Sequence, residues 1–184
     1  MPRAGLTPDV VVRAATELVD REGLQALTLA RIAETLGVRS PSLYNHVEGL
    51  EGLERAVALA GIAELGETCR SAVMGRSGEE AIRHLAVAYR GFARRHPGIY
   101  PLTQIARPGD AEYEEAAGRV LGSVTAVLSG MGYEGEELIH AVRSLRSALH
   151  GFAVLEAGDG FGLDVDLDAS FDWMVGMIRR GISR

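Results

Sequence analysis

The feature that most constrains this chain is a pair of helix signals set closely around Gly37. Thr28 is a favoured N-cap residue, and the apolar residues after it recur at helical spacing until the glycine. A glycine at that place ends a helix in the left-handed conformation and turns the chain tightly. Ser40, followed by proline, then repeats a helix start. We therefore predict two short helices, at 28–37 and 40–47, joined by a tight turn.

Small and apolar residues predict that these two helices pack closely. Ala33 permits a close approach, and Val38 and Leu43 fill the space between the helices, with Val47 at the far end. A polar surface remains on and just before the second helix, formed by Arg39, Ser40, Ser42, Tyr44, Asn45 and His46. This arrangement is typical of a helix-turn-helix that reads the major groove of DNA. Glycine-linked helices also occur in proteins that never contact DNA, so the spacing alone leaves both interpretations open.

Helix start and stop signals continue to the end of the chain, and no alternating strand pattern or internal repeat is present. The sequence therefore predicts an all-α fold. We expect an N-terminal three-helix helix-turn-helix domain at residues 1–52 and a C-terminal helical domain at residues 53–184. Besides the two short helices, the predicted helices span 7–23, 53–74, 77–96, 99–106, 111–131, 135–157 and 168–182.

The charge of the chain offers no general attraction to nucleic acid. The net charge is −6, Lys is absent, and residues 1–60 carry six Arg against eight Asp and Glu, a net of −2. DNA binding would therefore depend on the local placement of Arg, hydroxyl groups and helix N-termini. No apolar run approaches the ~18 residues of a membrane span, and no signal-peptide core is present. The single cysteine, Cys69, excludes an intrachain disulfide, so we expect a cytoplasmic protein with no membrane partner.

A longer motif surrounds the two short helices. The run from Leu27 to Leu53, LTLARIAETLGVRSPSLYNHVEGLEGL, closely resembles the DNA-binding signature of the TetR (tetracycline repressor-like) family. The segments HPGIYPLTQIARP (96–108) and SALHGF (147–152) resemble one branch of the ligand-binding domains of that family. The resemblance implies an all-helical regulator whose N-terminal domain binds DNA and whose C-terminal helices bind a small ligand and form a dimer.

Carried over by position, the resemblance implies DNA contacts at Thr28, Arg39, Ser40, Ser42, Tyr44, Asn45 and His46. Tyr44 and His46 would touch phosphates, and the remaining positions of the second helix would set the sequence preference. The fork of Arg39 matches O6 and N7 of guanine, and Asn45 matches adenine by the same logic. Ser40 is also the predicted cap of the second helix.

Two positions depart from the family pattern. The family usually has Lys shortly after the recognition helix, where it meets a backbone phosphate, whereas this chain has Glu48 and Leu50 there. Neither side chain can attract a phosphate. We therefore expect a lower affinity for DNA or a different docking tilt.

Two apolar stripes in the C-terminal region predict a subunit interface. Their members are Leu138, Val142, Leu145, Leu149 and Phe152 in one helix and Phe171, Met174 and Ile178 in the last helix. Heptad-like spacing suits helix pairing, and two helices from each subunit would make a four-helix interface in a homodimer. The alternative is that both stripes face the core of the monomer, and the resemblance favours the dimer for the last helix.

A ligand pocket is expected in the same region. Arg143, Arg146 and His150 lie on one helix face and suit an anionic or polar-aromatic ligand, although such a row is more often a solvated face. The candidate walls by topology are Tyr89, Phe92, Tyr100, Leu102 and Ile105, and aromatic residues at this spacing are more often plain core.

Hypotheses of three classes follow from the sequence. The first is a ligand-responsive repressor that binds a palindromic double-stranded operator as a homodimer. The second is a small-molecule binding or partner-interaction protein with weakened or lost operator binding, which Glu48, Leu50 and the net negative charge motivate. An enzyme is the third and is disfavoured, because no nucleophile elbow, phosphate loop or metal-ligand spacing is present. We therefore expect no catalytic residue, metal or cofactor.

Overall fold

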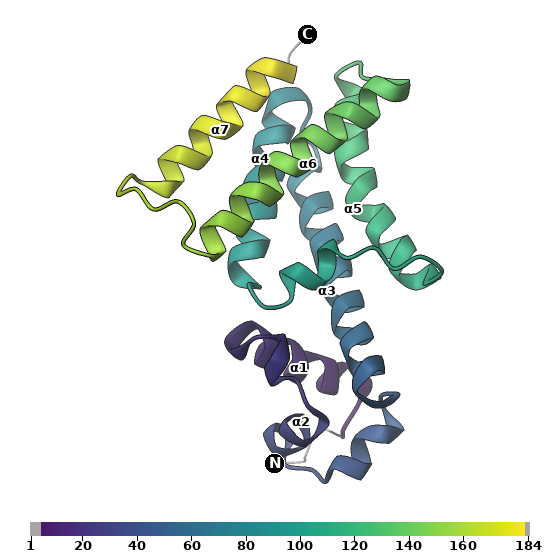
Figure 1. Ribbon diagram of the computed structural model, residues 1–184. Helices are drawn as coiled ribbons and strands as arrows, with labels where there is room; N and C mark the ends of the chain where they lie inside the picture. The colour runs from purple at the N-terminus through teal and green to yellow at the C-terminus, as the bar shows by residue number, and fades with distance from the viewer. Residues whose placement is uncertain (1–4, 183–184) are drawn as a thin grey trace.

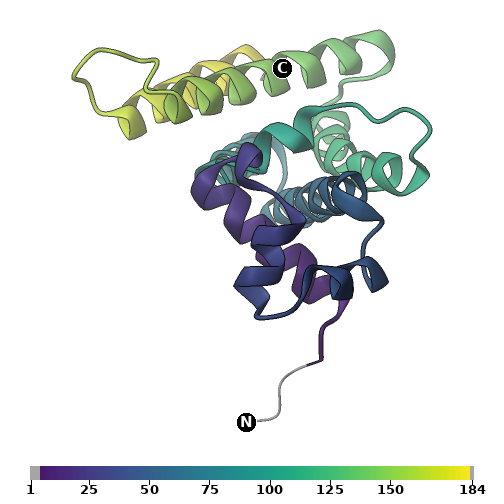
Figure 2. The same cartoon turned by 60° about the horizontal axis from the view of Figure 1, so that its bottom comes forward.

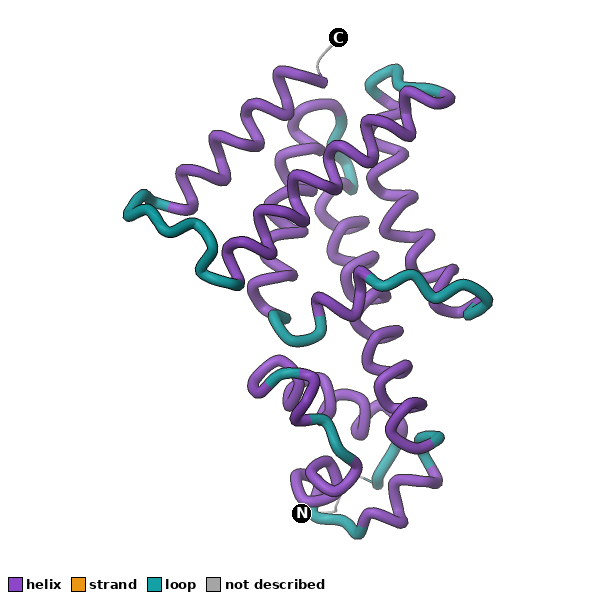
Figure 3. The backbone as a smooth tube through the Cα atoms, viewed as in Figure 1, coloured by secondary structure: helices purple, strands orange, loops and turns teal. Residues whose placement is uncertain are grey.

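The structure, a computed structural model, describes residues 5–182, and these residues form helices and loops only (Figure 3). The predicted all-helical fold is confirmed for this part of the chain. None of the described helices is both long enough and apolar enough to cross a membrane. In chain order, with η marking a 3-10 helix, the elements are α1 (Pro8–Glu22), η1 (Leu24–Ala26), α2 (Leu29–Leu36), η2 (Ser40–Asn45), α3 (Gly49–Val73), α4 (Gly78–Arg95), η3 (Tyr100–Gln104), α5 (Ala111–Gly130), α6 (Gly135–Ala157) and α7 (Leu167–Ile182) (Figure 1).

Helix α1 begins where its local signals place it. The Thr7 hydroxyl oxygen accepts the Val10 N–H at 3.3 Å, and Pro8 occupies the first turn. The Gly23 N–H ends the helix by donating to the carbonyl of Val19 at 2.8 Å. The apolar side of α1 is buried against α2 and α3, through Val11, Ala14, Ala15, Leu18 and Val19.

The turn after α2 has the two hydrogen bonds of a Schellman motif. Gly37 adopts a φ of +65° and donates its N–H to the carbonyl of Glu34 at 3.1 Å. The Val38 N–H donates to the carbonyl of Ala33 at 2.9 Å. The chain therefore reverses within two residues, and Leu43 on the next segment is fully buried.

The segment after this turn differs from the prediction. Ser40–Asn45 (η2) is a 3-10 helix instead of an α-helix that reaches Val47, and its N-cap is Arg39. No side chain caps η2, so the predicted capping role of Ser40 is wrong. Buried side chains at Leu43 and Val47 hold this segment in place. A run of six residues gains little from α-helical hydrogen bonds, so these contacts decide its conformation.

Helix α3 is the longest helix and joins the N-terminal helices to the rest of the molecule (Figure 1). It begins at Gly49, earlier than the predicted start at Leu53, and this glycine turns the chain into the helix with a φ of +73°. The helix therefore runs without a break across the domain boundary expected after residue 52. It packs on α1 near its start and on α4 and α5 further along.

Figure 2 shows α6 and α7 as an outer layer stacked on the other helices, away from α2.

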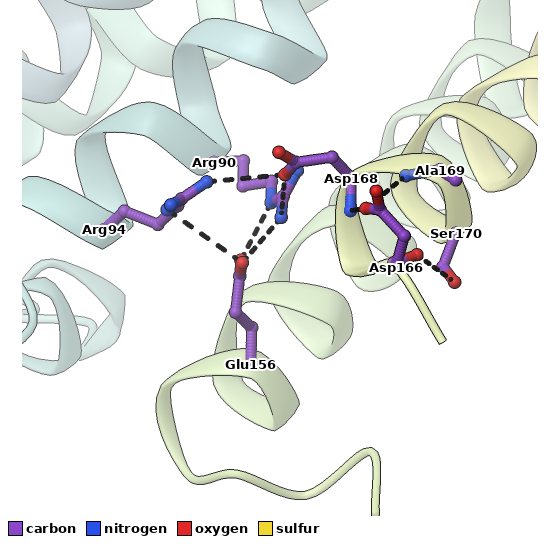
Figure 4. Close-up of polar contacts among 7 residues, drawn as sticks. All are labelled: Arg90, Arg94, Glu156, Asp166, Asp168, Ala169 and Ser170. Atoms are coloured by element: carbon purple, nitrogen blue, oxygen red, sulfur yellow. Dashed lines mark hydrogen bonds and ion pairs between the residues drawn. The ribbon is translucent and has the colours of Figure 1, made fainter. Parts of the chain in front are cut away.

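A buried arginine of α4 fixes this layer (Figure 4). Arg90 is 7% exposed and donates to both carboxylate oxygens of Glu156, at 2.6 and 2.8 Å. Its Nη2 also lies 2.8 Å from Oδ1 of Asp168, and its guanidinium lies 4.6 Å from the ring centroid of Phe171. Because a buried charge must stay paired, these contacts hold the end of α6 and the start of α7 against α4.

The apolar stripes that predict a subunit interface are used mainly inside the monomer. Leu145, Leu149, Phe152 and Phe171 are buried, and Leu138, Val142, Met174 and Ile178 are half-buried against the same core. The buried four therefore pack in the core of the monomer, as the alternative interpretation has it, and present little surface to a second subunit. The exposed large apolar residues of this layer are Ile139, Val154, Leu155, Trp173 and Met177.

The loop between α4 and η3 is bonded to α1. One carboxylate oxygen of Asp20, near the end of α1, accepts the N–H groups of Gly98 and Ile99, each at 3.0 Å. The other oxygen of Asp20 lies 2.7 Å from Nδ1 of His96, whose Nε2 lies 3.1 Å from a carboxylate oxygen of Glu64 on α3. The position of His96 before a proline suggests that its side chain caps helix carbonyls. The ring is instead held between the carboxylates of Asp20 and Glu64.

Only glycine fits where this loop crosses α1. A Cβ atom at Gly98 would lie 2.0 Å from the carbonyl oxygen of Val19 and 2.8 Å from Cα of Asp20. Both distances are too short for atoms that are not bonded. By contrast, a Cβ atom at Gly118, on the exposed side of α5, would meet nothing within 4 Å.

We expect the same substitution at these two glycines to have opposite effects. Gly98→Ala should lower the free energy of unfolding by about 1–3 kcal/mol, because the backbones of the loop and α1 must separate. Gly118→Ala should raise it by about 0.5–1 kcal/mol, because alanine is the better residue inside a helix. Urea denaturation followed by circular dichroism, at one protein concentration, measures both. Equal stability of the two variants would contradict the close packing of the loop on α1.

Candidate functional site

The first candidate site is the polar surface of η2 and the start of α2. Tyr44 is 63% exposed, and Arg39, Asn45 and Thr28 are also exposed. Ser40, Ser42 and His46 are half-buried. The structure therefore brings all the sequence-predicted DNA contacts to one end of the molecule, at the opposite end from the α6 and α7 layer (Figure 1).

Buried contacts hold this surface in place. Leu43 and Val47 lie in the core and anchor η2 from behind. The Thr28 hydroxyl oxygen accepts the Arg31 N–H at 3.2 Å and so caps α2, which leaves its own proton for another acceptor. Arg31 in turn donates to a carboxylate oxygen of Glu22 at 2.6 Å, which ties α2 to the end of α1.

The two departures from the family pattern lie beside this surface. Glu48 and Leu50 are both exposed, at the entry to α3. Glu48 is the N-cap residue of α3, but its side chain accepts no capping hydrogen bond. An exposed carboxylate at this place would repel a phosphate that came close to it.

The second candidate site is a cavity of about 110 Å³ among α3, α4, η3, α5 and α6. Most of its wall is apolar. The α6 stripe lies here, because Val142, Leu145 and Leu149 line the cavity. The polar lining residues are Tyr89, Thr103, Gln104 and Arg146.

A chain of hydrogen bonds runs along the polar side of this cavity. The side-chain carbonyl of Gln104 accepts from the Tyr89 hydroxyl at 3.4 Å and from Arg146 at 3.3 Å. The Tyr89 and Tyr100 hydroxyls are 3.0 Å apart, and the Tyr100 hydroxyl lies 2.7 Å from Nδ1 of His150. Burial, together with the neighbouring Tyr89, raises the pKa of Tyr100, so its hydroxyl stays neutral.

A polar cavity of about 270 Å³ adjoins the apolar one and shares Gln104 and Arg146 with it. Its other lining residues are Arg143, Ser147 and His150. Within residues 5–182, no Asp or Glu lines either cavity. The arginine row predicted from the sequence therefore lies at the mouth of a cavity.

Four of the five predicted wall residues do not line either cavity. Tyr100 is buried, with its hydroxyl between Tyr89 and His150. Ile105 is 52% exposed, because it follows the end of η3. Phe92 is fully buried, 4.9 Å from the ring of His96, and Leu102 is buried with its carbonyl bonded to the Tyr113 hydroxyl. Neither Phe92 nor Leu102 lines the cavity. Two lining residues, Thr103 and Gln104, were not predicted, because a 3-10 helix has no α-helical periodicity that would mark its inner side.

Two family models match this chain. The one described as Tetracyclin repressor-like, C-terminal domain, matches residues 82–178. The one described as bacterial regulatory proteins, tetR family, matches residues 11–57, which include α2, the glycine turn and η2. The chain belongs to the TetR family. It is therefore a DNA-binding transcriptional regulator of the helix-turn-helix type, and the family is not one of enzymes.

Two relatives align with nearly the whole of this TetR-family chain. The uncharacterized HTH-type transcriptional regulator YobS of Bacillus subtilis (strain 168) is 36% identical over 182 residues, which cover 98% of this chain and 95% of the relative. The uncharacterized HTH-type transcriptional regulator Rv0681 of Mycobacterium tuberculosis is 39% identical over 183 residues, with 98% and 84% covered.

Solved structures share the fold. A protein of unknown function from Rhodococcus sp. RHA1 matches with a TM-score of 0.85 at 20% identity, covering 98% of this chain and 97% of the other. A TetR variant from Acinetobacter baumannii AYE, in complex with minocycline, matches with a TM-score of 0.72 at 21% identity and 96% of both chains.

We expect the surroundings of His150 to make stability depend on pH. Burial, and then the charge of Arg146, lower the pKa of His150 below its ordinary value of 6.5. The unfolded chain therefore binds this proton more readily, so the contribution to stability is complete above pH 6.5 and is lost as the pH falls through the folded-state pKa. His150→Gln should reduce the loss of unfolding free energy between pH 7.5 and pH 5, measured by urea denaturation.

The exposed His140 on the same helix provides the matched control for this measurement. His140→Gln should keep the pH dependence of the parent chain. If His150→Gln and the parent lose the same unfolding free energy over this range, the lowered pKa of His150 is contradicted.

Proposed function

We propose that this chain is a ligand-responsive repressor that binds a palindromic operator as a homodimer and releases it when a small molecule fills the cavity. The observation that carries the proposal is that the segment 98–104 connects the cavity to α1. Thr103 and Gln104 of η3 line the cavity, and the residues just before η3 are bonded to Asp20 of α1. A ligand that moves η3 would therefore move α1, against which the DNA-binding helices pack.

Contacts with DNA are assigned from exposure and chemistry. Tyr44, which is 63% exposed, and His46 would donate to phosphates, which fix the orientation of the protein on the duplex. Arg39 would read guanine and Asn45 would read adenine in the major groove. Thr28, Ser40 and Ser42 would complete the surface with hydroxyl groups.

A second copy of the chain is the proposed partner of the outer layer. Trp173 and Met177 lie one turn apart on α7 and are 65% and 43% exposed, and Leu155 near the end of α6 is 47% exposed. Large exposed apolar side chains mark protein contact surfaces. A two-fold axis beside this layer that runs in the direction from α7 toward η2 would place both η2 segments at the same end of the dimer, as a palindromic operator requires.

Ligand control requires unequal binding to two conformations. A ligand shifts the population only as far as it binds the released form more tightly than the DNA-bound form. The proposed released form has a changed spacing between the two η2 segments, which no longer fits the two half-sites.

One feature supports a second function, a ligand-binding protein without operator binding. Glu48 and Leu50 place a repelling and a neutral side chain beside the DNA-binding surface. Under this alternative the cavity is used in the same way, but no sequence-specific complex with DNA forms.

Selection of bound sequences from a random duplex pool separates the two functions. The parent chain should enrich a palindrome whose half-sites are about one helical turn or somewhat more apart. Tyr44→Ala should abolish the enrichment, and Arg39→Ala should weaken discrimination at one base pair per half-site by about 1–3 kcal/mol. The exposed Arg83 on α4 lies outside the surface, so Arg83→Ala should select the parent's palindrome.

The outcomes of this selection are distinct. No enrichment at low salt, with or without added cavity ligand, would contradict the repressor and favour the binding protein. An enriched site without two-fold symmetry would contradict the homodimer on DNA. An unchanged preference with Arg39→Ala would contradict the reading role of that side chain.

A further inference from the structure

We propose that the ligand of the cavity is a compact organic anion, with one carboxylate-type head and an apolar body about the size of a benzene ring. The proposal rests on the proposed function and names the chemical class that the site takes. Its observation is that an apolar cavity and a polar, acid-free cavity meet at one shared arginine, Arg146.

The size and lining of the apolar cavity, called the inner cavity below, define the body of the ligand. An engineered apolar cavity of about 150 Å³ holds benzene, so a cavity of about 110 Å³ has room for at most a single ring or a short branched chain. The side chains on its inner walls are apolar, as at Leu65, Val124 and Leu145, and offer no partner to a polar substituent. A polar group placed there would lose its hydrogen bonds to water without replacement.

The polar cavity, called the outer cavity below, defines the head of the ligand. Arg143 and Arg146 both line it, and no carboxylate within the described residues forms an ion pair with Arg146. Arg146 donates one hydrogen bond to the protein, at 3.3 Å to Gln104, so most of its N–H donors remain available. Arginine binds carboxylates with paired N–H groups, in charge-assisted hydrogen bonds that are shorter and stronger than neutral ones.

Gln104 lies at the junction of the two cavities. Its amide nitrogen donates to the Thr103 hydroxyl at 2.8 Å, which turns its carbonyl toward Tyr89 and Arg146. Both bonds to that carbonyl are long, at 3.4 and 3.3 Å. A ligand carboxylate is a stronger acceptor than this carbonyl and would take its place at Arg146. Gln104 belongs to η3, so the exchange would act directly on the element bonded to α1.

The same contacts disfavour other classes of ligand. A cation would meet two arginines and no acid. A neutral apolar molecule would cover Arg146 without offering it an acceptor, which raises the cost of desolvating that charge. A large polycyclic molecule would exceed the inner cavity as it stands.

Calorimetric titration with matched probes tests the class. 3-Phenylpropanoate should bind the parent chain at least 10-fold more tightly than 3-phenylpropanamide, which has the same shape but no charge. Acetate, which has the head without the body, should bind too weakly to detect. Arg146→Gln should remove the preference for the carboxylate over the amide, while Arg83→Gln should keep it, because the exposed Arg83 lines neither cavity.

A second variant tests the body of the ligand. Ala117 lines the inner cavity, and Ala117→Phe should fill it and abolish binding of 3-phenylpropanoate, with the fold checked by circular dichroism. Equal binding of the carboxylate and the amide, or unchanged binding to Arg146→Gln, would overturn the proposal. So would failure of every phenyl monocarboxylate, from benzoate to 4-phenylbutanoate, to bind the parent chain.

These outcomes are separate from failure of the proposed function. Binding of the amide or of minocycline without a preference for anions would overturn the ligand class, while the cavity would remain a ligand site. Binding of the carboxylate that leaves the complex with the selected duplex unchanged would support the ligand class and contradict ligand-responsive repression.

Discussion

The Asp20 carboxylate is the contact on which the relation between the two ends of this molecule depends. One of its oxygens accepts the two N–H groups that lead into η3, and the other faces His96. The end of α1 and a wall of the cavity therefore share one anchor. Backbone N–H groups that lose a buried acceptor are costly, so the loop stays on α1 as long as the carboxylate is in place. Gly98 makes this closeness possible, because any side chain there would strike the carbonyl of Val19.

Helix α3 supplies a second connection between the same regions. Its first turns pack on α1, and further along Ile62 and Leu65 line the cavity. Arg55, early in α3, donates to both carboxylate oxygens of Asp110, each at 2.6 Å, and so ties the start of α5 to the DNA-binding end. Since both connections are packed or hydrogen-bonded, a change in the shape of the cavity reaches α1 by two routes. These two routes are the physical basis of the ligand control proposed above, in a chain whose net charge gives DNA no general attraction.

The helices could be predicted from the sequence because caps and glycine turns act within a few residues, as at Thr28 and Gly37. The errors lie where distant contacts decide. His96 follows the end of α4 as predicted, but its side chain bonds to Asp20 and Glu64, which are 76 and 32 positions away, and no local pattern reveals these partners. The spacing on α6 predicts both the arginine row and the apolar stripe. Periodicity predicts which residues share a helix face, but it does not predict what that face packs against. Leu145 and Leu149 therefore looked like interface residues, whereas they line a cavity.

Native-state hydrogen exchange at the amides of Gly98 and Ile99 tests whether the Asp20 carboxylate holds this loop on α1. We expect slow exchange in the parent chain, because a carboxylate oxygen of Asp20 accepts both N–H groups. In Asp20→Ala, exchange should accelerate at both residues and through η3, while the amides of α6 stay protected. The exposed Glu17 on α1 makes no contact with the loop, so Glu17→Ala should exchange as the parent does. Fast exchange at Gly98 and Ile99 in the parent, or equal rates in Asp20→Ala, would contradict the claim that this carboxylate joins the cavity to the DNA-binding helices.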